Sequence, residues 1–345
     1  MNDYVTEKSK PTELENCHFV KMVLMLLVVL CHSVSFWGGN WFQAYKPSTE
    51  LYSMKIISGW TGAIHVYGFV FVSGYLFFHL RETLGKYQDF TAFIKNKTKR
   101  LIIPYCFVCV VWVIPISVYF YHYSIKDIIV YYALGISPSQ LWFLLVIFWC
   151  YVICWILFKY VKSDALCIAI SIFLYIIGTA ERQMYYDFFS LFRGLQFVSF
   201  FTCGYLIRKH TQSINHKLLL IVCLCLHIAL YLISLSLSID NQLKAAYDLL
   251  LHLVSAVFIF ELLQYIAGRI KWQDNKTIRV LIHCSMPIYL FHQQIIYFII
   301  SVLNNKTHPV VISVLCFILS VSVSTGIACI IRKSRTAAIL IGDKQ

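Results

Sequence analysis

Long apolar runs alternate with short polar segments along the whole chain. A helix of about 20 apolar residues crosses the roughly 30 Å core of a bilayer, and ten runs approach this length. They cover residues 17–36, 58–79, 101–121, 139–161, 164–180, 189–207, 218–238, 246–267, 280–302 and 310–331. The pattern predicts an all-α, polytopic integral membrane protein with about ten transmembrane helices, among which the span over 164–180 is the weakest.

The composition agrees with this pattern and simplifies the expected domain organisation. The 345 residues are 59% hydrophobic and 13% charged, with a mean hydropathy of +0.72, which excludes an ordinary soluble protein, a collagen and a disordered chain. No polar stretch is long enough to build a separate aqueous domain. We therefore expect a leader over residues 1–16, one transmembrane domain over 17–331 and a basic tail over 332–345.

The distribution of basic residues predicts the orientation of the chain in the membrane. With the N-terminus in the cytoplasm, 21 Lys and Arg residues fall in cytoplasmic segments and seven fall on the other face. This asymmetry follows the positive-inside rule and predicts that both termini are cytoplasmic. The formal net charge of +13 is then explained by lipid orientation, so we expect membrane lipid and no nucleic acid among the partners.

The 13 cysteines indicate neither a disulfide framework nor a metal site. Nearly all of them lie inside apolar runs, where a free cysteine behaves as a small hydrophobic residue. Cys106 and Cys109 form a Cys-x-x-Cys, but it has no second pair and no histidine at ligand spacing. We expect free packing thiols and no bound metal.

Two ionisable residues, Lys21 and His32, interrupt the first apolar run. A charged side chain in a spanning helix costs about 2.5–3.5 kcal/mol on insertion scales, so both need a physical reason. They are eleven residues apart, which places them on nearly the same helix face and about 16 Å apart along the axis. One interpretation is a polar cavity through the bundle. The other is that Lys21 snorkels to the headgroups and His32 donates a hydrogen bond to a neighbouring helix.

The next two segments carry further polar and small residues. In the second run, His65 is expected at about the depth of His32, and Ser73 at about the depth of Lys21. Small residues here, such as Gly74, also favour close packing of helices. A basic block, Lys95-Asn96-Lys97-Thr98-Lys99-Arg100, directly precedes the third run. Such a block can set the topology, contact anionic lipid or bind the phosphates of a ligand.

These features occur in an order that resembles the acyltransferase 3 family of membrane O-acyltransferases. The motifs are a first-helix cation followed by histidine, a Phe-rich stretch ending in Ser-Gly, a basic element leading into proline, a Leu-Trp-Phe and a late Tyr-Leu-x-His. In this chain they are Lys21 with His32; Phe69, Ser73 and Gly74; Lys97, Arg100 and Pro104; Leu141-Trp142-Phe143; and Tyr289-Leu290-Phe291-His292. The first-helix cation is Lys rather than the more usual Arg, so a point charge replaces a bidentate group.

The resemblance implies transfer of an acyl group, most often acetyl, from cytoplasmic acyl-CoA to a sugar hydroxyl. The acceptor would be a cell-surface glycan or its lipid-linked precursor, and the location the plasma membrane, in bacteria the inner membrane. Acetyl-CoA would be the donor substrate, with no bound cofactor. Its implied binding residues are Lys97, Lys99, Arg100 and Ser73, and Ser73 or a nearby backbone N–H would stabilise the oxyanion.

The catalytic residues implied by the resemblance are His32 and Lys21. A neutral imidazole is the natural general base for a weakly acidic sugar hydroxyl. His32 acts either directly on the acceptor or through an acyl-imidazole intermediate; the sequence leaves both open. Candidate acceptor-binding residues are His65, Trp142 and His292.

Two other classes of protein compete with this interpretation. A transporter or flippase for a glycan or its lipid carrier would use the same polar stripe as a pathway. Transporters often consist of repeated halves with broken helices, and we find no internal repeat. A structural membrane subunit would leave Lys21 and His32 unexplained. The acyltransferase interpretation accounts for the largest number of residues.

Overall fold

The computed structural model describes residues 12–39, 41–184, 186–236 and 241–343, and these are helical with no strand. Residues 1–11 of the expected leader and the last two residues of the tail lie outside this part. The long helices are α1 (Glu13–Ser35), α2 (Tyr52–Phe78), α7 (Trp142–Tyr160), α8 (Asp164–Met184), α9 (Leu191–Lys209), α10 (His216–Ser236), α11 (Asn241–Ala267), α12 (Lys276–Leu303) and α13 (Pro309–Ile331). The shorter ones are α3 (Phe90–Lys97), α4 (Ile103–Val108), α5 (Ile114–Tyr121), α6 (Ile125–Ile128) and α14 (Arg335–Ile339).

Brief 3-10 or π turns connect or extend these helices. The 3-10 turns are η1 (Phe36–Gly38), η6 (Ser139–Leu141), η7 (Phe188–Ser190), η8 (Thr211–Ser213) and η9 (Trp272–Asp274). The π turns are η2 (His79–Thr83), η3 (Thr98–Ile102), η4 (Cys109–Val113) and η5 (Ile129–Ala133).

Within the described residues, nine helices are long and apolar enough to cross a membrane. The chain is thus an all-helical, polytopic membrane protein, as its hydropathy predicts. The weakest expected span, over 164–180, is among the nine as Asp164–Glu181. The expected span over 189–207 is α9, which has the length of a span but not the apolarity. Helix α9 packs against α2, α7 and α8, so protein rather than lipid surrounds its polar residues. Which side faces the cytoplasm stays a prediction.

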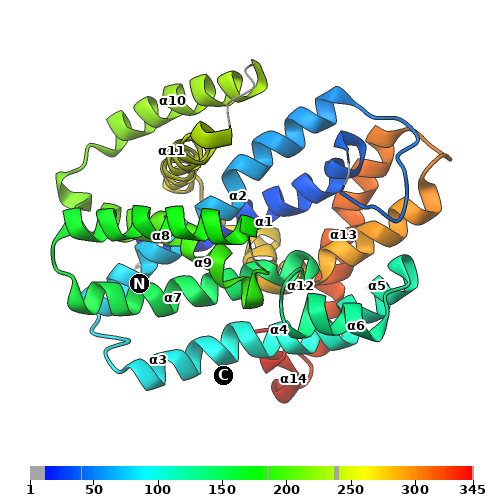
Figure 1. Ribbon diagram of the computed structural model, residues 1–345, viewed down its shortest axis with the longest axis horizontal. Helices are drawn as coiled ribbons and strands as arrows, with labels where there is room; N and C mark the ends of the chain where they lie inside the picture. The colour runs from blue at the N-terminus through cyan, green and yellow to red at the C-terminus, as the bar shows by residue number, and fades with distance from the viewer. Residues whose placement is uncertain (1–11, 40, 185, 237–240, 344–345) are drawn as a thin grey trace, which may run out of the picture.

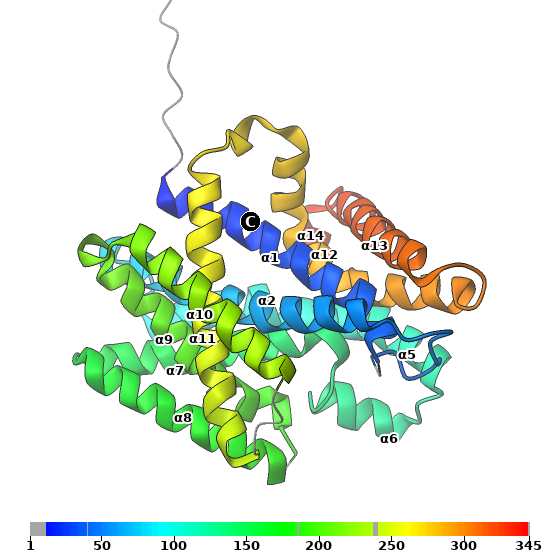
Figure 2. The same ribbon diagram turned by 90° about the horizontal axis from the view of Figure 1, so that it is seen from above.

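The helices differ in how much of their surface other helices cover. In Figures 1 and 2, α1 and α12 run through the middle of the bundle, while α8, α10 and α13 lie at its edges. The most apolar window of α12 is 67% buried and that of α10 only 11%. The apolar side chains that α10 leaves exposed are those expected of a lipid-facing helix. The polar residues Ser33 of α1, His65 of α2 and His292 of α12 are buried and lie inside protein.

Two glycines allow α2 and α9 to pack with their backbones in contact. A Cβ atom built on Gly74 of α2 would lie 1.9 Å from the carbonyl oxygen of Phe201, and one on Gly204 of α9 would lie 2.0 Å from that of Phe71. No side chain fits at either position. The close packing predicted for the Ser-Gly of the second run is confirmed for Gly74, and it leaves the neighbouring Ser73 near the centre of the bundle.

The segment after the basic block is one long helical path, Phe90–Tyr121, interrupted by two π turns. Each π turn directly precedes a proline-containing helix: η3 precedes Pro104, and η4 precedes Pro115. Proline has no N–H and its ring clashes with the carbonyl four residues earlier, which for Pro104 is that of Arg100. A π turn relieves this clash by widening the helix. The distortion places Arg100 in η3, at the edge of the bundle interior.

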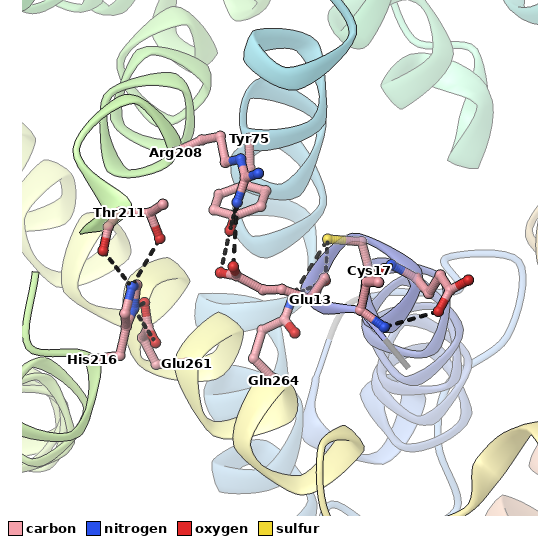
Figure 3. Close-up of polar contacts among 10 residues, drawn as sticks. Glu13, Cys17, Tyr75, Arg208, Thr211, His216, Glu261 and Gln264 are labelled. Carbon is pink, nitrogen blue, oxygen red and sulfur yellow. Dashed lines mark hydrogen bonds and ion pairs between the residues drawn. The ribbon is translucent and has the colours of Figure 1, made fainter. Parts of the chain in front are cut away.

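A polar cluster, here called the Glu13 cluster, joins α1, α2, α9, α10 and α11 (Figure 3). The carboxylate of Glu13 accepts hydrogen bonds from the Tyr75 hydroxyl and from Arg208, the latter at 3.2 Å. Arg208 also donates to the Tyr75 oxygen at 3.1 Å. Beside them, the carboxylate of Glu261 lies 2.9 Å from His216 Nδ1. Charges of opposite sign thus neutralise one another within this cluster.

Candidate active site

A cavity of about 270 Å³, here called the inner cavity, lies among α1, α2, η3, α7 and α12. Seven of the nine predicted site residues line it: Lys21, His32, His65, Ser73, Lys97, Arg100 and Trp142. Of the other two, His292 contacts His32 directly, and Lys99 is exposed and does not line this cavity. The structure therefore agrees with the interpretation that Lys21 and His32 of the first helix border a polar cavity.

His32 and His292 form a hydrogen-bonded pair at the side of the inner cavity. His32 Nδ1 and His292 Nε2 are 2.8 Å apart. The His32 ring lies close to two others, with ring centroids 5.0 Å from His292 and 4.9 Å from Trp41. His292 comes from the middle of α12 and is fully buried. These contacts fix the orientation of the His32 ring.

Backbone carbonyls determine which nitrogen of each histidine carries the proton. His292 Nδ1 lies 3.0 Å from the carbonyl oxygen of Ile288 and 2.9 Å from that of Tyr289. Carbonyl oxygens only accept hydrogen bonds, so His292 Nδ1 is protonated and, in the neutral ring, its Nε2 is an acceptor. His32 Nδ1 must then be the donor between the two rings. The neutral His32 consequently has its basic lone pair on Nε2, as a general base requires.

His65 has the same arrangement on α2. Its Nδ1 lies 2.6 Å from the carbonyl oxygen of Thr61, four residues earlier, and must therefore carry the proton. The basic nitrogen of a neutral His65 is again Nε2, and the side chain lines the inner cavity. Two imidazoles with defined tautomers thus border the same space. Of these two imidazoles, only His32 is hydrogen-bonded to another histidine, His292.

The cations lie toward one end of the cavity, where it meets a larger space of about 540 Å³, here called the vestibule. The two spaces share Lys21, Arg100, Ser285, Met286 and Gly342. Three cations, Lys21, Lys97 and Arg100, line the inner cavity, and the described residues that line it include no Asp or Glu. An excess of positive charge without carboxylates suits an anionic ligand.

Lys97 is held differently from the other cations. Its ammonium lies 3.4 Å from the ring centroid of Tyr151, 5.0 Å from that of Tyr87 and 5.3 Å from that of Phe93. The residue is 5% exposed. Cation–π contacts of this kind stabilise a desolvated ammonium. Lys97 therefore contributes its charge to the cavity from within an aromatic cage.

The two remaining predicted residues are positioned by their own neighbours. The Ser73 hydroxyl donates to the carbonyl oxygen of Phe69 at 2.8 Å, as serine often does inside a helix. Trp142 begins α7, and the guanidinium of Arg193 lies 4.4 Å from its ring centroid. An aromatic face in a cavity is a common platform for the apolar face of a ligand.

Sequence reasoning missed a set of glutamines beside this tryptophan. The amides of Gln140 and Gln294 exchange two hydrogen bonds, at 2.7 and 2.9 Å. The Gln140 side chain also donates to the carbonyl oxygen of Leu290, and the backbone carbonyl of Gln140 accepts from the Tyr289 hydroxyl. Gln140 lines the inner cavity and is 3% exposed. The only signal in the sequence was a polar residue directly before the Leu-Trp-Phe motif.

The arrangement combines a defined base, cations and an aromatic platform around one cavity. In the described part of the chain, no group of three or more His, Cys, Asp or Glu side chains is placed to hold a metal ion. The residues around His32 are suited to removing a proton from a ligand, and those at the vestibule to binding negative charge.

Comparison with known proteins gives one match. The family model described as an acyltransferase domain, of the acyltransferase 3 type, matches residues 16–329. Neither a curated protein nor a solved structure matches the chain. The matched region includes every predicted site residue and ends shortly before α14.

Proposed function

Because the chain belongs to the acyltransferase 3 family, we propose that it transfers an acetyl or related acyl group from acyl-CoA to a sugar hydroxyl. The acceptor is a cell-surface glycan or its lipid-linked precursor, and the membrane is the plasma membrane, in bacteria the inner one. The observation that carries the proposal is the His32–His292 pair, which lies on the same cavity as Lys21 and Arg100. This arrangement places a general base and a cationic surface that can bind an anion on the same cavity.

The donor enters from the vestibule in this proposal. Acyl-CoA carries several phosphate charges, and Lys21 and Arg100 line both the vestibule and the inner cavity. These cations bind the phosphates by charge-assisted hydrogen bonds and leave the thioester to extend toward His32. In the orientation that the basic residues predict, the vestibule lies on the cytoplasmic side.

His32 then moves the proton. As the sugar oxygen attacks the thioester carbonyl carbon, His32 Nε2 accepts the hydroxyl proton. The carbon–sulfur bond breaks, and the CoA thiolate leaves with the proton that His32 held. His292 keeps the His32 ring in the required tautomer by accepting from its Nδ1. A route through an acyl-imidazole uses the same nitrogen as the nucleophile.

An assay of the purified protein tests this proposal. In detergent or vesicles, the native protein should release free CoA thiol from acetyl-CoA in the presence of a glycan acceptor and label that acceptor with acetyl. His32→Ala should remove both signals while the protein still folds. Full transfer by His32→Ala would show that the base is misassigned. Movement of glycan across vesicles without consumption of donor would establish a transporter instead.

A further inference from the structure

The end of the chain, residues 332–343, folds back onto the cytoplasmic-side vestibule of the proposed function and is here called the C-terminal strap. Its short helix α14 is capped by Ser334, whose hydroxyl accepts from the N–H of Ala337. The chain then reverses through Gly342, which has φ +83°. Figure 1 shows α14 below α4. A basic tail was expected here, and the structure adds that it is folded and packed.

An ion pair closes the strap on itself and ties it to α12. Arg332 donates to both carboxylate oxygens of Asp343, at 2.6 and 2.9 Å. The same guanidinium donates to the carbonyl oxygen of His283 at 2.9 Å and contacts the sulfur of Cys284 at 3.2 Å. The hydrogen bonds to Asp343 raise the pKa of Arg332 above its ordinary value, so the guanidinium stays charged. One side chain thus joins both ends of the strap to α12.

The far end of the strap is wedged into the bundle. Ile341 is fully buried in an apolar cluster with residues of α1, α4, α7 and α12. A Cβ atom on Gly342 would lie 3.2 Å from the carbonyl oxygen of Arg100 and 3.5 Å from side-chain atoms of Met286 and Pro104. Because Pro104 has no N–H, this carbonyl of Arg100 lacks the helical hydrogen bond that it would otherwise accept from residue 104. Gly342 therefore stands between η3 and α12, where the vestibule joins the inner cavity.

The strap also supplies part of the wall of both spaces. Gly342 lines the inner cavity and the vestibule, and Asp343 lines the vestibule with His18 and His283. Asp343 would repel phosphates if it stood alone, but Arg332 neutralises it. At about 540 Å³ the vestibule is twice the size of the inner cavity and falls in the range of roughly 300–1,000 Å³ that is usual for small-molecule sites.

The vestibule and the inner cavity differ in size, and so do the two parts of acyl-CoA. The donor has a bulky phosphorylated nucleotide at one end and a narrow pantetheine arm with the thioester at the other. The nucleotide is the bulkier of these two parts, and the vestibule is the larger of the two spaces. We propose that the C-terminal strap is a specificity wall for the donor, in which the Arg332–Asp343 pair positions residues 341–343 so that the vestibule holds the nucleotide part.

This inference rests on the proposed function and predicts a selective effect on the donor. The test compares acetyl-CoA with S-acetylpantetheine, which has the same thioester and arm but no nucleotide. The native protein should prefer acetyl-CoA. Arg332→Gln should raise the KM for acetyl-CoA about tenfold, the usual effect of losing a charge-assisted pair, with kcat and the KM for S-acetylpantetheine unchanged. Arg332→Lys, which keeps the charge but not the two-point contact, should lie between the two.

Two controls make the result decisive. Lys333→Gln removes a neighbouring exposed charge and should leave both KM values unchanged. Exchanging the pair, with Arg332→Asp and Asp343→Arg together, should restore much of the preference for acetyl-CoA. If Arg332→Gln does not fold, Arg332→Lys decides alone.

Two outcomes would count against the inference in different ways. Equal changes of KM for both donors, or no change for either, would overturn the role of the strap while leaving the proposed function intact. A native protein that consumes neither donor would instead overturn the proposed function, and the role of the strap with it.

Discussion

Ionisable side chains gather at two places inside the bundle, around His32 and around Glu13, and the two places differ in what surrounds them. In the Glu13 cluster, Arg208 meets Glu13 at 3.2 Å and His216 meets Glu261 at 2.9 Å (Figure 3). None of these four residues lines the inner cavity or the vestibule. Around His32, the cations and histidines border a cavity with no carboxylate among its described lining residues.

The difference separates charges that pair with one another between helices from charges that border a cavity. An ion pair inside a protein recovers part of its desolvation cost from its partner, so its natural role is structural. Cations gathered on a cavity wall recover that cost when an anion binds. A polar residue in a spanning helix is thus only a first indication of a functional site. The presence of a cavity beside it is the second.

The largest expected effect comes from His32 and a matched histidine outside the cavity. His32→Ala should lower turnover by about 10²–10⁴-fold, the usual contribution of a general base. His227→Gln should keep the native turnover, because the buried His227 lines neither space and its hydrogen bonds are to Trp60 and Ser255, at 2.9 and 2.8 Å. Turnover per folded molecule is the measurement. Equal losses in both variants would mean that His32 is structural as well.

The next effect concerns the cation shared by the two spaces. Lys21→Gln should raise the KM for acetyl-CoA about tenfold, since a charge-assisted contact contributes about 1.5–3 kcal/mol. Lys21→Arg should retain a low KM because it keeps the charge. Initial rates across a range of donor concentrations measure both. A loss of folding in place of a rise in KM would place Lys21 with the structural charges of the Glu13 cluster.

The smallest effect should appear in the Glu13 cluster and in stability alone. Arg208→Met leaves Glu13 without its ion-pair partner, but the Glu13 side chain is 40% exposed, so water screens much of the change. We expect a loss of about 1 kcal/mol, near the value for exposed pairs, seen as a Tm lowered by a few degrees. Turnover per folded molecule should not change. Lys217→Met, at an exposed position, controls for the loss of charge alone.

A fall in turnover of folded Arg208→Met would break the comparison. It would show that the Glu13 cluster communicates with the cavity through α1, which carries both Glu13 and Lys21. An unchanged turnover with a lower Tm would sharpen the comparison instead, by separating stability from chemistry on one helix.

Much of the fold could be predicted because hydropathy is a property of neighbouring residues. Nine of the ten expected spans are found among the described helices that can cross a membrane. The exception, α9, carries polar residues such as Arg193 and Gln196 that other helices surround. Helix α9 contacts α2, α7 and α8 where other spans contact lipid, and no local pattern in the sequence indicates such contacts.

The candidate site was predictable only in part, for the same reason. Helical geometry alone placed Lys21 and His32 on one face, and family motifs added His292. The predicted donor-binding residues also included Lys99 of the basic block, which is exposed outside both spaces. Gln140 and Gly342 went unnoticed, because nothing near them in the chain marks them as cavity residues. The roles assigned to these residues stay predictions, which the assays above test.

By itself the sequence determined a helical membrane protein, the positions of most spans and the family motifs, since each depends on residues close together in the chain. The tertiary structure decided which polar residues share a space. His32 and His292 are separated by 260 positions, yet their nitrogens are 2.8 Å apart. Such contacts arise from the packing of α1 against α12, and close packing of side chains is a property of the whole bundle. The same is true of the C-terminal strap, in which Gly342 and Asp343 line the vestibule while Arg332 and Ile341 contact the helices.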